Sequence, residues 1–325
     1  MFLSHKYKYV DGYYNIGKAI EDGEAVIISD KDAKVIYLYD CIQEKNFCFK
    51  YAERSGGYHY IANKVVYESL ISKMVKKYMP AVQYYPARLN EELGVICDDW
   101  DTDLETYTPL YTAILNNPKS AIYEEIFADG KIHSDRIIRK LSKVEDILDY
   151  KTELSEFITD NVFDNLLKVP EHFLLGNLDF NVKNFAVNSK LGKSDKFLSF
   201  DFGFNAFCML EQYLRKDITF MNKDVLDAYN SFFTCFYPVA FGTGVRLNIA
   251  DYDTFKNFLK DLKYAVRNYP NMKQNLEEAI NFSDNDLNTA MLELTEKDCV
   301  DIGFTAKEII KRVIDFNRNN LSKCL

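Results

Sequence analysis

The sequence has few of the features that mark metal sites, disulfide scaffolds or exported proteins. Its seven cysteines are scattered and never form a Cys-x-x-Cys pair, and its four histidines are never paired at helical spacing. This pattern argues against a zinc site or a disulfide framework and favours reduced thiols in a cytosol. The first ten residues lack the apolar run of a signal peptide, and the most apolar run, 232–241, is too short to span a bilayer. The sequence therefore predicts a cytoplasmic protein without a membrane partner.

Basic residues are also under-represented, with 40 Lys and Arg against 49 Asp and Glu and a net charge of -9. A nucleic-acid partner is not favoured by this balance, whereas a nucleotide bound through magnesium does not require a basic protein. Tryptophan occurs once, but 23 Tyr and 24 Phe bring the hydrophobic content to 47%. Such a composition predicts a large packed core, and 325 residues suffice for one two-lobed domain or two small domains.

The most informative spacing lies in the middle of the sequence. Asn184 follows Asp179 by five positions, and Asp201-Phe202-Gly203 begins seventeen positions after Asn184. Enzymes of the kinase type use this order because phosphoryl transfer needs one carboxylate to accept a hydroxyl proton. It also needs an amide and a second carboxylate to hold magnesium against the phosphates. We therefore predict Asp179, Asn184 and Asp201 as catalytic residues, with Asn184 and Asp201 as ligands of Mg²⁺.

Each of these pieces is weak alone. An Asp–Asn pair is common in an acidic chain, and Asp-Phe-Gly is more often an ordinary turn after a strand. Their order, the short gap and the hydrophobic framing favour the kinase interpretation. Apolar runs predict strands at 185–187 and 197–200, paired as a hairpin that turns at 188–194. Such a hairpin would bring Asn184 close to Asp201.

A lysine and a glutamate upstream stand in the order that a kinase needs. Lys50 lies near the end of the third predicted strand, 46–51, where kinases carry the lysine that binds the α- and β-phosphates of ATP. Glu68 borders the apolar stripe of a helix predicted over 60–79. We predict an ion pair between Lys50 and Glu68 and assign both, with Asp201, to nucleotide binding. The alternatives are an exposed cation and a surface glutamate. The lysines of the helix are interpreted as solvent-facing charges: Lys64, Lys73, Lys76 and Lys77.

The segment Gly176-Asn177-x-Asp179-x-x-x-x-Asn184-Phe185 resembles the catalytic loop of the HipA family of bacterial serine/threonine kinases, whose usual form is Gly-Asn-x-Asp-Arg-His-x-x-Asn-Phe. Phe180 and Asn181 stand where that pattern has Arg and His. The resemblance is specific at 176–185 and 201–203 and loose elsewhere. It implies phosphorylation of a protein Ser or Thr in a bacterial cytoplasm, with ATP and Mg²⁺ as cofactors. It also implies a protein substrate and an antitoxin-type partner within a toxin–antitoxin system.

We predict an α+β, two-lobed, protein-kinase-like fold. A small β-rich lobe (1–99) would contain one long helix, and a larger helical lobe (100–325) would carry the catalytic loop and the metal-binding Asp-Phe-Gly. The other strands are expected at 25–28, 35–39, 83–89 and 93–97, and the helices of the large lobe at 110–115, 134–148, 152–167, 222–236, 253–268, 274–282 and 305–321.

Two other functions fit the same residues. A small-molecule kinase of the aminoglycoside or choline type shares the Asp-x4-Asn spacing and the later metal-binding Asp, although Gly176-Asn177 favours the protein-kinase relative. A pseudokinase that acts by protein interaction is supported by the altered Phe180 and Asn181 and by the missing Gly-x-Gly-x-x-Gly before residue 45. Only the turn 29–34 lies where such a phosphate loop would be. Five residues together weigh against the pseudokinase: Lys50, Glu68, Asp179, Asn184 and Asp201.

Overall fold

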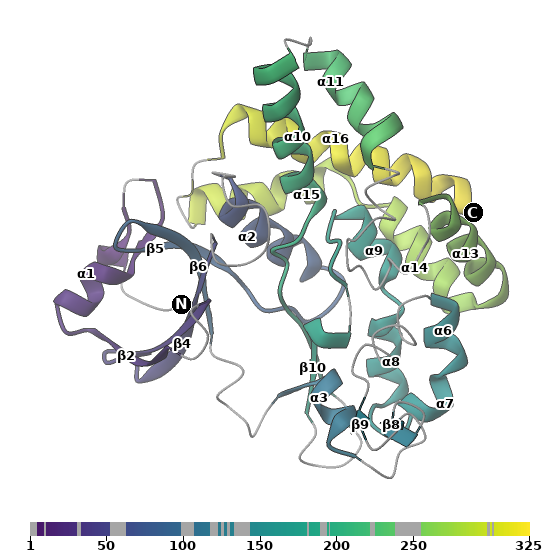
Figure 1. The fold of residues 1–325 in the computed structure, drawn as a ribbon, viewed down its shortest axis with the longest axis horizontal. Helices are drawn as coiled ribbons and strands as arrows, with labels where there is room; N and C mark the ends of the chain where they lie inside the picture. The colour runs from purple at the N-terminus through teal and green to yellow at the C-terminus, as the bar shows by residue number, and fades with distance from the viewer. Residues whose placement is uncertain are drawn as a thin grey trace.

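A computed structural model of the chain has a small lobe built around a curled sheet and a larger lobe built mainly from helices (Figure 1). The structure describes residues 5–9, 11–30, 34–52, 63–98, 107–117, 123–124, 127–128, 131–132, 144–180, 182–188, 194, 196–221, 225–237, 255–297, 300 and 302–325. The predicted boundary between residues 99 and 100 lies outside these ranges. No helix among the described residues is both long and apolar enough to cross a membrane.

The small lobe contains a six-stranded sheet in the order β1-β5-β6-β4-β3-β2. Neighbouring strands are antiparallel, except that β1 runs parallel to β5. The five strands predicted here are confirmed, because alternating burial along strands such as β3 follows the alternation of apolar residues in the sequence. The strands are β1 (Tyr14–Asn15), β2 (Ala25–Asp30), β3 (Val35–Asp40), β4 (Lys45–Tyr51), β5 (Tyr85–Leu89) and β6 (Glu92–Asp98).

A short helix that the sequence analysis missed, α1 (Ile16–Glu21), packs against β2 and β5 at this sheet. Asn15 caps it, since its Oδ1 accepts a hydrogen bond from the backbone N–H of Lys18 at 2.9 Å. Ile16 and Ala19 of this helix join a cluster of buried side chains from the sheet, which includes the fully buried Phe47 and Phe49. This cluster forms a core that belongs to the small lobe alone.

The pairing of β4 with β6 requires glycine at position 94. A side chain there would place its Cβ 2.4 Å from the carbonyl oxygen of Lys50 and 2.5 Å from the ring of Phe49. Such distances are far below van der Waals contact, so a larger residue would push the two strands apart. Gly94 thereby keeps Lys50 in register opposite Val95.

Helix α2 (Lys64–Val75) lies between the sheet and the large lobe, and all of its residues are buried. Part of the predicted range, 60–62, lies outside the described residues. Two of its lysines were wrongly predicted to face solvent. Lys64 Nζ donates to the carbonyl oxygen of Ala52 at 2.8 Å, and Lys73 Nζ lies 4.8 Å from the ring centre of Tyr85. Long aliphatic stems allow lysines to be buried where the ammonium group reaches a carbonyl or an aromatic face.

The first described elements of the large lobe are β7 (Thr108–Pro109) and α3 (Leu110–Leu115), and the lobe contains a small sheet in the order β11-β10-β7. The hairpin predicted around the catalytic segment is confirmed, with Phe185 opposite Ser199 and Val187 opposite Phe197. The other strands and α-helices of this lobe are β8 (Phe127–Ala128), β9 (Lys131–Ile132), α6 (Val144–Asp149), α7 (Lys151–Leu154), α8 (Asp160–Leu166), α9 (Val169–Leu174), β10 (Phe185–Val187), β11 (Phe197–Ser199), α10 (Ala206–Met221), α11 (Val225–Ser231), α13 (Phe255–Asn268), α14 (Pro270–Ile280), α15 (Asp284–Leu292) and α16 (Phe304–Leu321).

The prediction of one continuous helix over 152–167 is wrong, because this range contains two helices, α7 and α8. Between them the chain pairs with Ser194, whose N–H donates to Phe157 O at 2.7 Å and whose carbonyl accepts from Thr159 N at 2.8 Å. Thr159 then caps α8. The helices α10 and α15 were not predicted. Most of the range predicted over 134–148 lies outside the described residues.

Candidate active site

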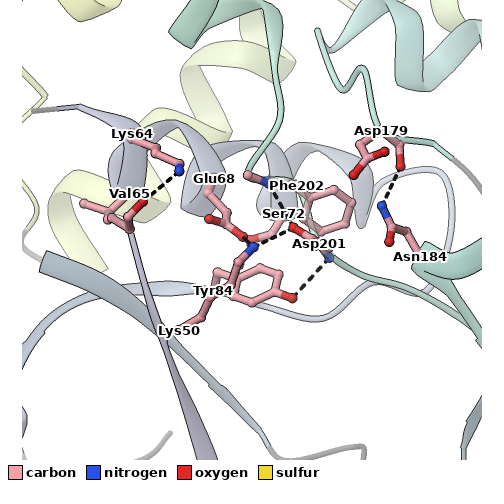
Figure 2. A network of polar contacts seen from close by, with 12 residues as sticks. Lys50, Lys64, Val65, Glu68, Ser72, Tyr84, Asp179, Asn184, Asp201 and Phe202 are labelled. Carbon is pink, nitrogen blue, oxygen red and sulfur yellow. Dashed lines mark hydrogen bonds and ion pairs between the residues drawn. The ribbon is translucent and has the colours of Figure 1, made fainter. Parts of the chain in front are cut away.

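Three charged side chains from different parts of the chain meet at one point between the lobes (Figure 2). Lys50 projects from β4, Glu68 from α2, and Asp201 from the segment that follows β11. Lys50 Nζ lies 2.9 Å from Oε1 of Glu68 and 2.5 Å from Oδ1 of Asp201. The predicted ion pair between Lys50 and Glu68 is therefore confirmed, and the same ammonium group also holds Asp201.

Burial and mutual attraction act in opposite directions on these three groups. Burial lowers the pKa of Lys50, but Asp201 and Glu68 outweigh burial and hold that pKa above its ordinary value. Burial raises the pKa of Glu68, and Lys50 opposes this only in part. Burial also disfavours the charge of Asp201, yet Lys50 brings the net pKa of that carboxyl below its ordinary value. At neutral pH the cluster thus presents an ammonium group beside an ionised Asp201, whose side chain is 40% exposed.

The Asp-Phe-Gly segment ends in a glycine, Gly203, because the charged cluster leaves little space for a side chain there. A Cβ at this position would lie 3.1 Å from Nζ of Lys50 and 3.2 Å from Oε2 of Glu68. Any side chain would therefore press on the charged cluster. The N–H of Gly203 also donates to Oδ1 of Asp201 at 3.4 Å, which is a long hydrogen bond.

The strand that leads to Asp201 is tied to the connection between α2 and β5. The N–H of Ser199 donates to Pro80 O at 3.0 Å, and the N–H of Val82 donates to Ser199 O at 2.9 Å. Beyond this bridge, the backbone of Asp201 adopts a left-handed φ of 59°. Its N–H donates to the hydroxyl oxygen of Tyr84 at 3.1 Å. Sequence reasoning missed Tyr84, because a tyrosine before a strand carries no signal of this contact.

The predicted catalytic loop lies beside this cluster (Figure 2). The side-chain amide of Asn184 donates to the backbone carbonyl of Asp179 at 2.7 Å, and the backbone carbonyl of Asn184 accepts from Phe200 N at 3.0 Å. At the start of the loop, Asn177 is buried and accepts the N–H of Asp179 through its Oδ1 at 3.2 Å. These contacts hold Asp179 and Asn184 together, next to the segment that carries Asp201.

A buried histidine that the sequence analysis did not single out, His172, contacts Asn177 at the start of the loop. His172 Nδ1 lies 2.7 Å from Nδ2 of Asn177, and Nε2 lies 3.2 Å from the sulfur of Met79. Oδ1 of Asn177 accepts the N–H of Asp179, so the NH₂ group of Asn177 is the one that faces Nδ1 of His172. Nδ1 therefore accepts this hydrogen bond, and the proton of the neutral histidine is assigned to Nε2. Burial lowers the pKa of His172 far below its ordinary value, so the ring is neutral.

Phe180, one of the departures from the resembling motif, packs against this ring. The ring centres of Phe180 and His172 are 3.9 Å apart, and those of Phe180 and Phe185 are 4.5 Å apart in an edge-on arrangement. The loop is thus supported by aromatic packing at the position where the motif has an arginine. Asn181, the second departure, lies outside the described residues.

No protein-family model matches the chain, and neither does any curated protein. Among solved structures, the chain is similar to one described as the crystal structure of a Helicobacter pylori proinflammatory kinase, CtkA. The TM-score is 0.55 and the identity 16%, over 92% of this chain and 95% of that chain. The chain has a two-lobed, kinase-like fold. The fold class predicted from the sequence is therefore confirmed.

Within this kinase-like fold, the donor atoms present suit magnesium. No cluster of three or more His, Cys, Asp or Glu side chains among the described residues could hold a metal by itself. Mg²⁺ commonly takes one or two protein ligands and completes its shell with phosphate oxygens and water. The ionised carboxylate of Asp201 and Oδ1 of Asn184, whose Nδ2 is used elsewhere, are oxygen donors of this type. Residues 31–33, within the turn where a phosphate loop was considered, lie outside the described residues.

Proposed function

We propose that the protein is an ATP-dependent phosphotransferase of the kinase type that transfers a phosphoryl group to a hydroxyl. The observation that carries this proposal is the double contact of Lys50. Its ammonium group bonds Glu68 of α2 and Asp201 of the large lobe at once. Asp179 and Asn184 are held together beside this cluster. An ammonium group, carboxylates and an amide are the groups that phosphoryl transfer uses, so this grouping of side chains supports the proposal.

Each group has a distinct role in this account. Lys50, oriented by Glu68, would bind the α- and β-phosphates of ATP. Asp201 and Asn184 would hold Mg²⁺, which neutralises charge on the phosphates when bound. Asp179 would accept the proton of the attacking hydroxyl. Little covalent chemistry is needed, so positioning and charge supply most of the rate acceleration.

A protein Ser or Thr is the proposed acceptor, on the basis of the resemblance of 176–185 to the HipA catalytic loop. The packing of Phe180 on His172 supports an ordered loop despite the lost arginine, which weakens the case for a pseudokinase. A bacterial cytoplasm and an antitoxin-type partner belong to the same proposal. A small-molecule acceptor is the main alternative, because the same five groups would serve it.

Incubation of the purified protein with γ-labelled ATP and Mg²⁺, alone and with a cell lysate, tests this function. We expect label on a protein band, stable to acid as a phosphomonoester of Ser or Thr. Label on a small metabolite would establish the small-molecule kinase. No transfer, with or without lysate, would contradict the proposal and favour a pseudokinase. The variant Lys256→Ala, at an exposed position of α13, is the control and should behave as wild type.

A further inference from the structure

A tyrosine of the small lobe makes a direct hydrogen bond to the backbone of Asp201. Tyr84 lies immediately before β5 and is buried. Its hydroxyl oxygen accepts the N–H of Asp201 at 3.1 Å, and its ring meets Phe202 edge-on, with ring centres 5.9 Å apart. Its own N–H donates to Oγ of Ser72 in α2 at 3.2 Å. Tyr84 therefore links the helix that carries Glu68 to the segment that carries Asp201 (Figure 2).

The conformation of Asp201 requires such support. A φ of 59° is in the left-handed region, which residues with a side chain adopt at a cost. This backbone conformation sets the direction of the carboxylate, whose Oδ1 lies 2.5 Å from Nζ of Lys50. Among the described residues, the hydroxyl of Tyr84 is the acceptor for the N–H of Asp201. Without it, the N–H would lose its partner and the local backbone would be free to relax.

We infer that the hydroxyl of Tyr84 is a positioning group, which holds Asp201 in the left-handed conformation that directs its carboxylate to Lys50 and to Mg²⁺. The inference rests on the proposed function for its catalytic consequence. Tyr84 acts through the backbone of Asp201 and makes no contact with the reacting atoms in this account, so it is not a catalytic residue. Burial raises the pKa of Tyr84, so the hydroxyl remains protonated and neutral.

The variant Tyr84→Phe removes this hydroxyl and keeps the ring that packs on Phe202. We expect the Mg²⁺ concentration for half-maximal phosphoryl transfer to rise about tenfold, because one hydrogen bond that orients the metal ligand is lost. The turnover number at saturating Mg²⁺ should fall less, and the unfolding midpoint should stay close to that of wild type. In hydrogen exchange, peptides spanning residue 201 should exchange faster in the variant, also about tenfold.

The matched control is Tyr78→Phe, which removes a buried hydroxyl that has no hydrogen-bond partner among the described residues. It should leave the Mg²⁺ dependence and the exchange at residue 201 unchanged. An unchanged Mg²⁺ dependence in Tyr84→Phe would overturn the inference. So would a loss of activity matched by a fall in the unfolding midpoint, which would make the hydroxyl a purely structural group.

Hydrogen exchange separates failure of this inference from failure of the proposed function. If wild type neither binds nor turns over ATP, the proposed function fails. Exchange at residue 201 then decides alone whether Tyr84 holds Asp201. Faster exchange in Tyr84→Phe would support the hydrogen bond as the positioning contact, and unchanged exchange would overturn it.

Discussion

At the centre of the site, a single ammonium group is shared by two carboxylates that lie far apart in the sequence. Lys50 and Glu68 are both largely buried, with side-chain exposures of 15% and 3%. Buried ion pairs add little net stability, because the cost of removing charges from water offsets their attraction. The cluster is therefore better explained by the orientation it gives to Lys50 and Asp201 than by its contribution to folding.

Glu171 is a second buried carboxyl, next to the histidine that supports the catalytic loop. Its side chain is only 1% exposed, and its one charged neighbour by ion pairing among the described residues is Lys168. Lys168 lies 3.2 Å from it and is shared with Glu278 at 2.9 Å. Burial raises the pKa of Glu171 from 4.5 to about 8, and Lys168 opposes this only in part. The carboxyl is thus protonated in the folded protein at neutral pH.

The stability of the protein should therefore depend on Glu171 between about pH 5 and about pH 8. The folded state keeps a proton that the unfolded chain has released, so the free energy of unfolding falls as pH rises through this window. The slope from this group approaches about 1.4 kcal/mol per pH unit. In Glu171→Gln that contribution should vanish, which urea unfolding at several pH values would measure. The exposed Glu277→Gln on α14 is the control, and equal slopes in wild type and Glu171→Gln would refute the assignment.

At the scale of elements, polar contacts join α2 to the sheet of the small lobe and to α10 of the large lobe. Glu68 faces Lys50, while the preceding Tyr67 donates its hydroxyl to Oε2 of Glu211 in α10 at 2.7 Å. Asn63 donates to the same oxygen at 3.1 Å, and Arg215 donates to Oε1 at 2.6 Å. Glu211 is buried, so this network fixes the rotation of α2 that directs Glu68 into the site.

Removing Glu211 should loosen α2. In Glu211→Ala the buried hydroxyl of Tyr67 loses its acceptor, so we expect a loss of about 2 kcal/mol in the free energy of unfolding and weaker binding of Mg-ATP. Tyr67→Phe should cost less, about 1 kcal/mol, because Glu211 keeps its other partners. Urea unfolding and calorimetry with Mg-ATP would measure both effects.

The control for this pair is Glu308→Ala in α16, where the partner Arg312 lies four residues away on a partly exposed face. Such a pair contributes little to stability. Unaltered nucleotide affinity in Glu211→Ala would show that α2 does not need this network to present Glu68.

The elements that could be predicted are those in which the spacing of apolar residues along the chain shows which side chains are buried. Alternating apolar residues gave the strands of the small lobe, and the order of Lys50, Glu68, Asp179, Asn184 and Asp201 gave the candidate site. The division between α7 and α8 was not predictable, because it depends on pairing with the distant Ser194. Tyr84 and Glu211 were missed for the same reason, since their roles come from tertiary contacts.

At the scale of the whole molecule, the candidate site is divided between the lobes. Lys50 and Glu68 belong to the small lobe, and Asp179, Asn184 and Asp201 belong to the large lobe. The contact between Lys50 and Asp201 joins the two lobes, so in this arrangement the proposed nucleotide-binding and transfer groups lie together (Figure 1).

The most direct test of the proposed function compares Asp201→Asn with Asp179→Asn by calorimetry with Mg-ATP and by a phosphorylation assay. Asp201→Asn should weaken magnesium-dependent ATP binding and abolish transfer, because a metal ligand is lost. Asp179→Asn should bind ATP nearly as wild type does, while turnover falls about a thousandfold, because its interaction matters mainly in the transition state. An Asp179→Asn variant that transfers phosphate as fast as wild type would contradict the account.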